Sequence, residues 1–295
     1  MRPPDGWEID KGDPRYPETL LTTPDPPKRI YGLGNPNLLT PGLAVIGARK
    51  STPYGRSCAH LFAGWAASRG VVIVSGAAVG CDQAAHRAAL EVDGATVAVL
   101  GCGADVDYPR DATQLLDVIR ARGAVISEQP WGSTPRRWAF SRRNRIIAGL
   151  SHSVLVVEAS LPSGTFSTAD HALEADREVL VVPGSILSPE CRGSNRLLVQ
   201  GATPITDVSE LAAVLGLLGA PEDAEHTVSH DLSRRDAIMT ALVANPMRPD
   251  DLAREFALDI VTVARRLGEL ERDGKVIRLR DGRYSPVENK RRRPH

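Results

Sequence analysis

The most constraining feature of the sequence is an alternation of short apolar runs and longer amphipathic stretches from residue 43 to about residue 217. The runs are LAVIG (43–47), VVIVSG (71–76), TVAVLG (96–101), AVIS (124–127), VLVVEA (154–159) and VLVVPG (179–184). Their length and β-branched content predict buried strands, and the stretches between them have helical spacing. Strands that are apolar throughout and separated by helices are typical of a mostly parallel sheet covered on both faces. We therefore predict an open α/β sandwich.

The rest of the 295 residues divides around this domain, which we place at 43–217. Residues 1–42 are rich in proline but too apolar for a loose tail, so we expect a short helix and turns packed on the main domain. Residues 218–232 are polar and predict a linker, and 233–287 predict a second, small domain. The basic ending 288–295 is predicted to be disordered.

The second domain has the pattern of a winged helix. Three helical stretches are expected, at 234–244, 249–256 and 260–273. Asp281-Gly282 then joins two short strands, which is a strong hairpin signal. Arg265 and Arg266 lie on the third stretch, where a recognition helix would contact DNA, but acidic residues follow on the same stretch. DNA contact and protein contact both remain open for this domain.

Composition excludes several classes of protein. The 36 basic and 36 acidic residues cancel, so any affinity for nucleic acid must come from local patches. Four cysteines without a C-x-x-C pair do not fit a zinc ribbon or a disulfide framework, and we expect reduced thiols, no metal and no cofactor. The sequence has no signal-like apolar core and no run of about 18 apolar residues, so we expect a cytoplasmic protein.

The segment 136–159 carries the strongest functional signal. No Asp or Glu occurs between Glu128 and Glu158, while two aromatic residues, Trp138 and Phe140, stand among five arginines. The arginines are Arg136, Arg137, Arg142, Arg143 and Arg145. Cations that neutralise phosphates and rings that stack on bases are what single-stranded nucleic acid requires. The alternative is that the aromatic rings are core and the arginines a solvated face, but five cations without a compensating acid would repel one another.

The loop that follows the first predicted strand, GARKSTPYG, opens a helix and could hold an anion through Gly47, Arg49, Ser51 or Thr52. It matches neither the G-x-G-x-x-G pattern of dinucleotide-binding proteins nor the G-K-[ST] of a phosphate-binding Walker loop. A nicotinamide dehydrogenase and an ATPase are therefore disfavoured. A merely structural tight turn remains the alternative.

Two further strand-end loops carry polar groups. Ser75 and Gly76 end a strand, and Asp82 near the next helix start is expected to cap that helix rather than to act in catalysis, with His86 bonded to a neighbour. Glu158 is either a general base or an acceptor of loop N–H groups. The residues Ser163, Gly164 and Thr165 form a hydroxyl-lined turn before a helix and could bind an anion.

Taken in order, the motifs resemble the DNA-processing protein A family, also called DprA or Smf. They are DPRYPETLLTTPDPP…YGLGNPNLL, VIGARKSTPYG, SGAAVGCDQAAHRAAL, TVAVLGCGADVDYP, SEQPWGSTPRRWAFSRRNRIIAGLS, VVEASLPSGTFSTADHALEADREVLVVPG and GSNRLLVQGA. The resemblance covers roughly residues 13–207, and the C-terminal stretch resembles the winged helix of many members.

The resemblance implies an extended Rossmann-like fold that binds single-stranded DNA as a homodimer. It also implies that the protein protects incoming DNA in natural transformation, loads the RecA recombinase onto it and catalyses no reaction. The pocket residues that it implies are Gly47, Arg49, Ser51, Ser75, Gly76, Asp82, Arg142, Arg143, Asn144, Arg145, Ser163, Gly164 and Thr165.

The sequence departs from the family pattern at three positions. Val79 and Thr203 replace residues that are usually basic, and Ser141 replaces a proline. Loss of two cations predicts weaker DNA binding, for which Arg136 and Arg137 could compensate. The competing interpretation is a nucleotide-binding or phosphoribohydrolase-like Rossmann enzyme. Its glycine-rich signature would fall at LPSGTFSTAD, where no glutamate has the catalytic spacing after Thr165.

Overall fold

The structure, a computed structural model, describes residues 2–217 and 237–287. It divides into two compact units, Met1–Leu218 and Gly219–His295. The linker predicted at 218–232 and the tail predicted at 288–295 lie outside the described residues. Across the described ranges, every helix is too short or too polar to cross a membrane.

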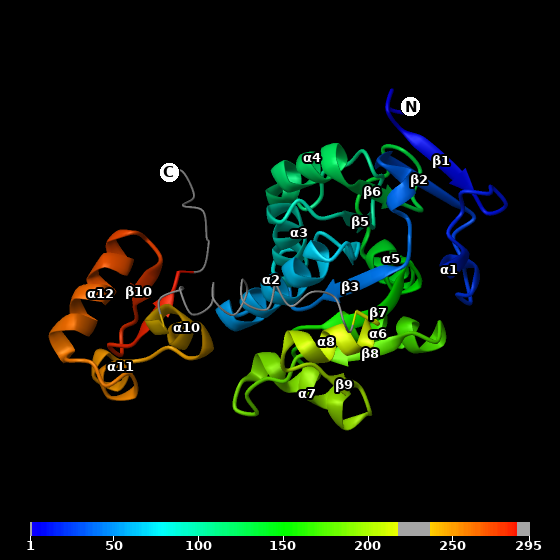
Figure 1. The fold of residues 1–295 in the computed structure, drawn as a ribbon. Helices are drawn as coiled ribbons and strands as arrows, with labels where there is room; N and C mark the ends of the chain where they lie inside the picture. The colour runs from blue at the N-terminus through cyan, green and yellow to red at the C-terminus, as the bar shows by residue number, and fades with distance from the viewer. Residues whose placement is uncertain (1, 218–236, 288–295) are drawn as a thin grey trace. The chain divides into compact units, whose positions relative to one another are not determined.

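The first unit is built on a nine-stranded, mostly parallel sheet (Figure 1). The strands are β1 (Trp7–Asp10), β2 (Arg29–Gly34), β3 (Gly42–Ile46), β4 (Ile73–Ser75), β5 (Thr96–Leu100), β6 (Ala124–Ser127), β7 (Ser151–Val156), β8 (Glu178–Val181) and β9 (Thr203–Pro204). Their order is β1-β2-β6-β5-β4-β3-β7-β8-β9. The six apolar runs correspond to β3 to β8, and the predicted α/β class is confirmed.

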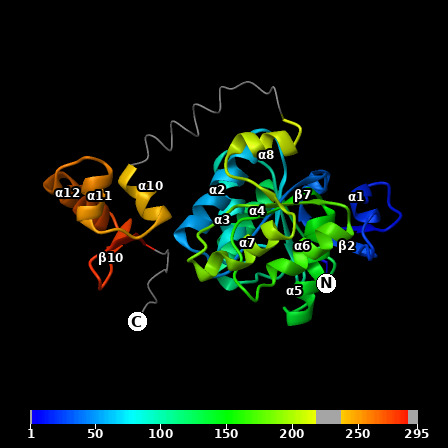
Figure 2. The same ribbon diagram turned by 90° about the horizontal axis from the view of Figure 1, so that it is seen from below.

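Helices cover both faces of this sheet, as the two views in Figures 1 and 2 show. The helices are α1 (Glu18–Leu21), α2 (Pro53–Ser68), α3 (Cys81–Glu91), α4 (Thr113–Arg122), α5 (Arg137–Gly149), α6 (Thr165–Glu174), α7 (Arg192–Val199) and α8 (Val208–Val214). On one face Val99 and Val156 pack with Ile146 of α5. On the other, Leu100 packs with Leu116 and Ile119 of α4. Successive residues of a strand thus serve opposite cores, which is why the strands are apolar throughout.

The N-terminal segment departs from the sequence-based expectation. It contains the short helix α1, but it also adds β1 and β2 to the sheet, with β2 antiparallel to β6. Ile9 and Ile30, paired across the two strands, are almost completely buried. The prediction of a helix and turns alone was wrong because the prolines around these two strands dominated the pattern.

The second unit has the predicted three helices and hairpin. Its elements are α10 (Ala237–Ala244), α11 (Pro249–Glu255), α12 (Ile260–Arg272), β10 (Val276–Arg278) and β11 (Tyr284–Pro286). Buried Leu252, Leu267 and Val276 join these elements in one small core. Gly282 has a φ of +84° in the turn between the strands, the left-handed conformation that glycine adopts without strain. This is a winged-helix arrangement.

Candidate functional site

The site lies where the order of the parallel strands reverses. β3 has β4 on one side and β7 on the other, so the chain leaves the carboxyl ends of β3 and β7 in opposite directions. Such a reversal opens a crevice that commonly holds ligands in α/β sheets. Here it is a cleft of about 680 Å³. Its lining includes Gly47, Arg49, Lys50, Asp82, Arg137, Phe140, Ser141, Arg143, Asn144, Ser163, Gly164, Thr165 and Glu190.

The loop after β3 brings two cations to the cleft. Arg49 and Lys50 are both exposed and line it. Gly47 precedes them where the chain passes close to its neighbours, since a Cβ there would lie 2.7 Å from Cys81 Sγ and 3.1 Å from the Glu158 carbonyl oxygen. Glycine is therefore required for the loop to take this path.

A buried carboxylate fixes the far end of the same loop. Glu158 accepts hydrogen bonds from the Thr52 backbone N–H at 2.8 Å and from its hydroxyl at 2.6 Å. Thr52 in turn is the N-cap of α2 and accepts a bond from the Gly55 N–H at 3.1 Å. Burial raises the pKa of Glu158, although the bonds from Thr52 oppose the shift. Both oxygens hold the loop, which favours the anchoring role over the general base.

Hydrogen bonds of Ser75 and Asp82 fix the end of β4 and the loop that follows it. The Ser75 hydroxyl donates to the Val45 carbonyl at 2.6 Å, and Ser75 is completely buried. Asp82 accepts weak bonds from the N–H groups of Gly76 at 3.2 Å and Ala78 at 3.4 Å. The prediction that Asp82 caps α3 was wrong in position, since Gly80 occupies the N-cap and Asp82 lies in the first turn. Its side chain binds the preceding loop instead.

His86 is bonded to a neighbour, as predicted. Its Nδ1 lies 2.7 Å from the Thr96 hydroxyl, which itself donates to the Ile73 carbonyl, so Nδ1 carries the hydrogen. The side chain is fully buried, and burial lowers its pKa to about 3. His86 is a neutral core residue.

One face of α5 forms a wall of the cleft. Arg137, Phe140, Ser141 and Asn144 are spaced at i, i+3, i+4 and i+7 and all line it. The neighbouring position Arg143 is only 4% exposed, and its guanidinium donates to the Val99 carbonyl. Arg137 thus offers a solvated charge to a ligand, whereas Arg143 offers a buried one.

The buried guanidinium of Arg143 explains why residue 76, directly after β4, is a glycine. A Cβ on Gly76 would lie 2.1 Å from Arg143 Nη1, so only glycine leaves room for it. Burial lowers the pKa of Arg143 to about 10, while the nearby Asp82 carboxylate raises it. Burial likewise raises the pKa of Asp82, which Arg143 opposes. Arg143 and Asp82 therefore stabilise one another at the floor of the cleft.

Aromatic rings border the cleft and continue it. The Arg49 guanidinium lies 5.7 Å from the centroid of the Phe140 ring, and the Tyr108 ring lies 5.1 Å from it. These side chains and exposed Val79 also line an adjoining pocket of about 90 Å³. A planar apolar group could lie against these rings while its charged neighbours stay on the cations.

The loop after β7 supplies hydroxyl groups at a helix start. The Ser163 hydroxyl donates to Thr165 Oγ1 at 2.9 Å and accepts from the Thr165 N–H at 3.2 Å. Both residues and Gly164, the N-cap of α6, line the cleft. The N–H groups and dipole of this helix start favour an anion.

Several predicted site residues lie outside the cleft lining. The hydroxyl groups of Thr52 and Ser75 bond Glu158 and the Val45 carbonyl. Ser51 is buried, with its hydroxyl 3.5 Å from Arg56 Nη1. Gly76 lines the adjoining pocket. Arg136 is exposed at the N-cap of α5.

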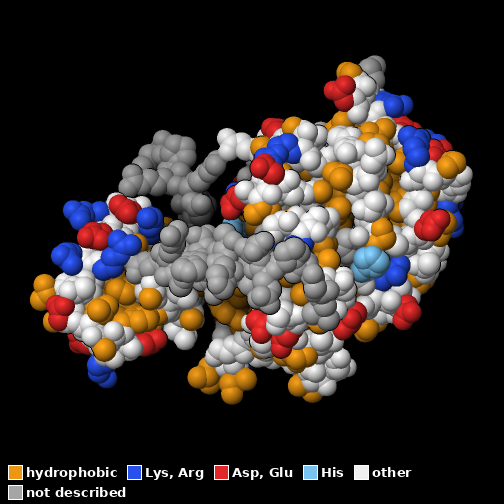
Figure 3. Space-filling model, viewed as in Figure 1, with side chains coloured by type: hydrophobic (Ala, Val, Ile, Leu, Met, Phe, Trp, Pro, Cys, Tyr) orange, Lys and Arg blue, Asp and Glu red, His pale blue; other side chains and the backbone are white. Residues whose placement is uncertain are grey.

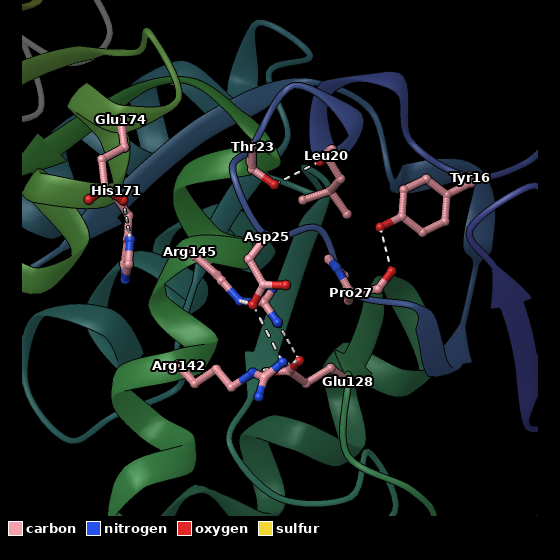
Figure 4. A network of polar contacts seen from close by, with 10 residues as sticks. All are labelled: Tyr16, Leu20, Thr23, Asp25, Pro27, Glu128, Arg142, Arg145, His171 and Glu174. Carbon is pink, nitrogen blue, oxygen red and sulfur yellow. Dashed lines mark hydrogen bonds and ion pairs between the residues drawn. The ribbon is translucent and has the colours of Figure 1, made fainter.

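Arg142 and Arg145 form ion pairs on another face of α5 (Figure 4). Arg145 Nη2 lies 2.5 Å from Glu128 Oε2, and Arg142 Nη2 lies 3.4 Å from Asp25 Oδ2. The argument that these arginines lack a compensating acid was therefore wrong, because acids from other elements reach them.

Two charged lining residues were missed in the sequence. Lys50 stands beside Arg49 in the same motif, and its position after a strand was sufficient to include it. Glu190 comes from the short 3₁₀ helix at Pro189–Cys191, and no local pattern places it here. Within the residues that the structure describes, no three His, Cys, Asp or Glu side chains are grouped to hold a metal ion.

Comparison with known protein families gives two matches. The profile of DNA recombination-mediator protein A matches residues 8–216, and that of the DprA winged helix domain matches residues 219–282.

Individual relatives agree with these matches. The chain is 38% identical over 276 residues to Protein Smf of Escherichia coli strain K12, covering 90% of this chain and 74% of the relative. It is 37% identical to DNA processing protein DprA of Bacillus subtilis, covering 67% of each. The chain spans about half, 53%, of the similar Smf protein of Synechocystis.

Two solved structures are similar. DNA processing protein A of Streptococcus pneumoniae has a TM-score of 0.68 at 37% identity, covering 71% of this chain and 74% of that one. That of Helicobacter pylori, whose structure describes a single-stranded DNA binding mode, has a TM-score of 0.65 at 31% identity, covering 71% and 95%.

Proposed function

The chain belongs to the DNA recombination-mediator protein A family, and from this we propose that its cleft binds single-stranded DNA. The observation that carries the proposal is the meeting of exposed Arg49, Lys50 and Arg137 with the Phe140 and Tyr108 rings. Cations attract the phosphates, and the rings accept the faces of unpaired bases. A duplex keeps its base faces stacked and does not offer them to such rings.

The balance of charge favours an anionic ligand. Arg49, Lys50, Arg137 and Arg143 line the cleft against the acids Asp82 and Glu190. The nearby Arg143 offsets the negative charge of Asp82. The similar Helicobacter pylori protein, described with single-stranded DNA, supports the same ligand.

The wider role follows from family membership. We propose that the protein acts in the cytoplasm as a homodimer, protects incoming single strands in natural transformation and transfers them to the RecA recombinase without catalysing a reaction. The chain covers 74% of the Escherichia coli relative and 53% of the Synechocystis one, so these partners are inferred from relatives that are longer than the matched region.

The test is a titration of labelled oligo-dT at rising salt concentrations. For the wild type we expect binding that weakens steeply with salt. Lys50→Ala combined with Arg137→Ala should weaken binding roughly tenfold at about 0.1 M salt and lower the salt slope by about 1.4, since each phosphate contact to a single strand contributes about 0.7. The matched control is Arg87→Ala with Arg122→Ala, which removes two exposed arginines of α3 and α4 that line neither the cleft nor the adjoining pocket.

Equal binding by the wild type and the cleft variant would place the DNA elsewhere. Binding that does not respond to salt would contradict the phosphate contacts. Release of free base from AMP or CMP, detected by chromatography, would favour the competing phosphoribohydrolase-like activity.

A further inference from the structure

Trp138 is exposed on the first turn of α5. The four tryptophans of the chain all lie in the described residues, and Trp138 is the exposed one, at 52%. Trp7 and Trp65 are buried, and Trp131 donates to Glu8 and packs edge-on against Tyr31. Trp138 is therefore not part of the core, and its indole offers an exposed aromatic face on which a planar group can stack.

Helical spacing places Trp138 beside two arginines rather than in the cleft. Arg142 and Arg145 follow at i+4 and i+7, so the three residues share a face of α5. This face, which we call the outer face of α5, is next to the cleft face that carries Arg137 and Ser141. Figure 4 shows Arg142 and Arg145 on this helix together with Asp25 and Glu128.

The ion pairs on the outer face differ in how firmly they are held. Arg145 and Glu128 are 7% and 9% exposed and lie 2.5 Å apart. Arg142 and Asp25 are 51% and 67% exposed and lie 3.4 Å apart. The pairs are linked, since Arg142 Nε also lies 3.4 Å from Glu128 and Arg145 Nε lies 3.5 Å from Asp25. An ion pair in water contributes little, so a phosphate can replace the exposed Asp25 at Arg142, while Arg145 keeps its shorter contact with Glu128.

We propose that a strand leaving the cleft continues over the outer face of α5, where one base stacks on Trp138 and a phosphate replaces Asp25 at Arg142. The inference rests on the proposed function and extends its site. Charge favours DNA as the occupant, because exposed Arg136 and Arg137 precede Trp138 and α5 contains no acidic residue. Alternating cations and a ring fit the alternating phosphates and bases of an unpaired strand.

The first experiment measures the affinity for oligo-dT as its length increases, in the wild type, Trp138→Ala and Trp138→Phe. Short oligonucleotides that fill the cleft alone should bind all three proteins equally. Beyond a threshold length, Trp138→Ala should bind about 5- to 160-fold more weakly, the range that stacking of one base spans at about 1–3 kcal/mol. Trp138→Phe should retain most of the affinity, because phenylalanine also stacks.

Fluorescence gives a second readout. Long oligo-dT should quench the tryptophan emission of the wild type, and the quench should be largely absent in Trp138→Phe although that variant still binds. Leu173→Ala is the matched control, since Leu173 on α6 is 66% exposed and should change neither affinity nor quench.

Asp25→Asn tests the exchange of partners at Arg142. It should raise the affinity for long oligo-dT severalfold and leave short oligonucleotides unaffected, because the competing carboxylate is gone. Asp176→Asn is the control for net charge, since Asp176 is exposed between α6 and β8, at the opposite end of the parallel strands.

The outcomes separate the two proposals. A wild type that does not bind oligo-dT defeats the proposed function. A wild type that binds, loses affinity with Lys50 and Arg137 replaced, and is indifferent to Trp138→Ala at every length defeats the outer face alone. Concentration-dependent self-association that Trp138→Ala abolishes, with DNA binding unchanged, would assign the indole to a second copy of the chain and also overturn the inference.

Discussion

Helices α5 and α12 invite comparison, because each has 13 residues and is rich in arginine. α5 contains no acid, and two of its arginines are buried against the rest of the first unit. α12 alternates its arginines with Glu269 and Glu271, and Arg266 pairs with Glu269 at 2.8 Å. Figure 3 shows the same mixture of charges over the C-terminal unit.

The difference teaches that the number of arginines does not by itself predict an anion site. What matters is where their partners come from. On α12 the acids lie one turn away and neutralise the surface whatever the fold. On α5 the acids come from distant elements, so the fold decides which arginines are neutralised and which reach the cleft.

The largest expected contrast concerns the burial of one arginine. Arg143→Met should lower the free energy of unfolding by about 3 kcal/mol, because the change leaves the buried Asp82 carboxyl without its nearby cation. Arg265→Met on α12 should change it by less than about 0.5 kcal/mol, since Arg265 is exposed. Denaturant unfolding followed by circular dichroism measures both, and equal losses would show that the two helices do not differ in this way.

Acids provide the next comparison. Glu128→Gln removes the partner of Arg145 where both side chains are less than one tenth exposed, and we expect a loss of about 2 kcal/mol. Glu269→Gln removes the partner of Arg266, where both are 40% exposed, and at most about 0.5 kcal/mol should be lost. Thermal melts of the two variants rank them, and a larger effect at Glu269 would contradict the assignment of α5 as the helix tied to the core.

The architecture could be predicted from the sequence because each strand and turn is specified by residues within its own short segment. Apolar runs such as residues 96–101 are buried on both faces, and that burial is recorded in their composition. The same holds for the hairpin at Gly282. The strands β1 and β2 were missed because the prolines around them dominate the pattern of residues 1–42.

The site was predictable to the extent that it is made of strand ends. Arg49 and Ser163 reach the cleft because a parallel sheet gathers its carboxyl ends at one edge. The ion pairs of Arg142 and Arg145 were not predictable, since Asp25 is 117 residues from Arg142 and Glu128 is 17 from Arg145. Periodicity says which face a residue occupies but not which distant acid meets it.

The pH dependence of stability should include a contribution from His86 in the first unit. His86 is fully buried, which lowers its pKa to about 3, whereas an unfolded histidine titrates at about 6.5. Between these values the unfolded chain binds the extra proton, so stability falls as the pH falls, by up to about 1.4 kcal/mol per pH unit. His86→Gln should remove this part of the slope between about pH 6 and pH 4 in tryptophan-monitored unfolding. The same slope in both proteins would mean that His86 has the same pKa in the folded and unfolded chain.

The smallest expected effect comes from making α12 resemble α5. Glu269→Gln with Glu271→Gln removes the acids beside its arginines and should raise the affinity for oligo-dT by about two- to threefold through the more positive surface. The control is Asp250→Asn with Asp251→Asn on α11, which changes net charge equally but leaves α12 intact. A gain confined to the α12 variant in gel-shift titrations at low salt would show that this helix lies within reach of bound DNA. An equal gain in both variants would show that net charge alone raises the affinity. A loss of affinity would mean that the glutamates of α12 hold the winged helix in the form that binds.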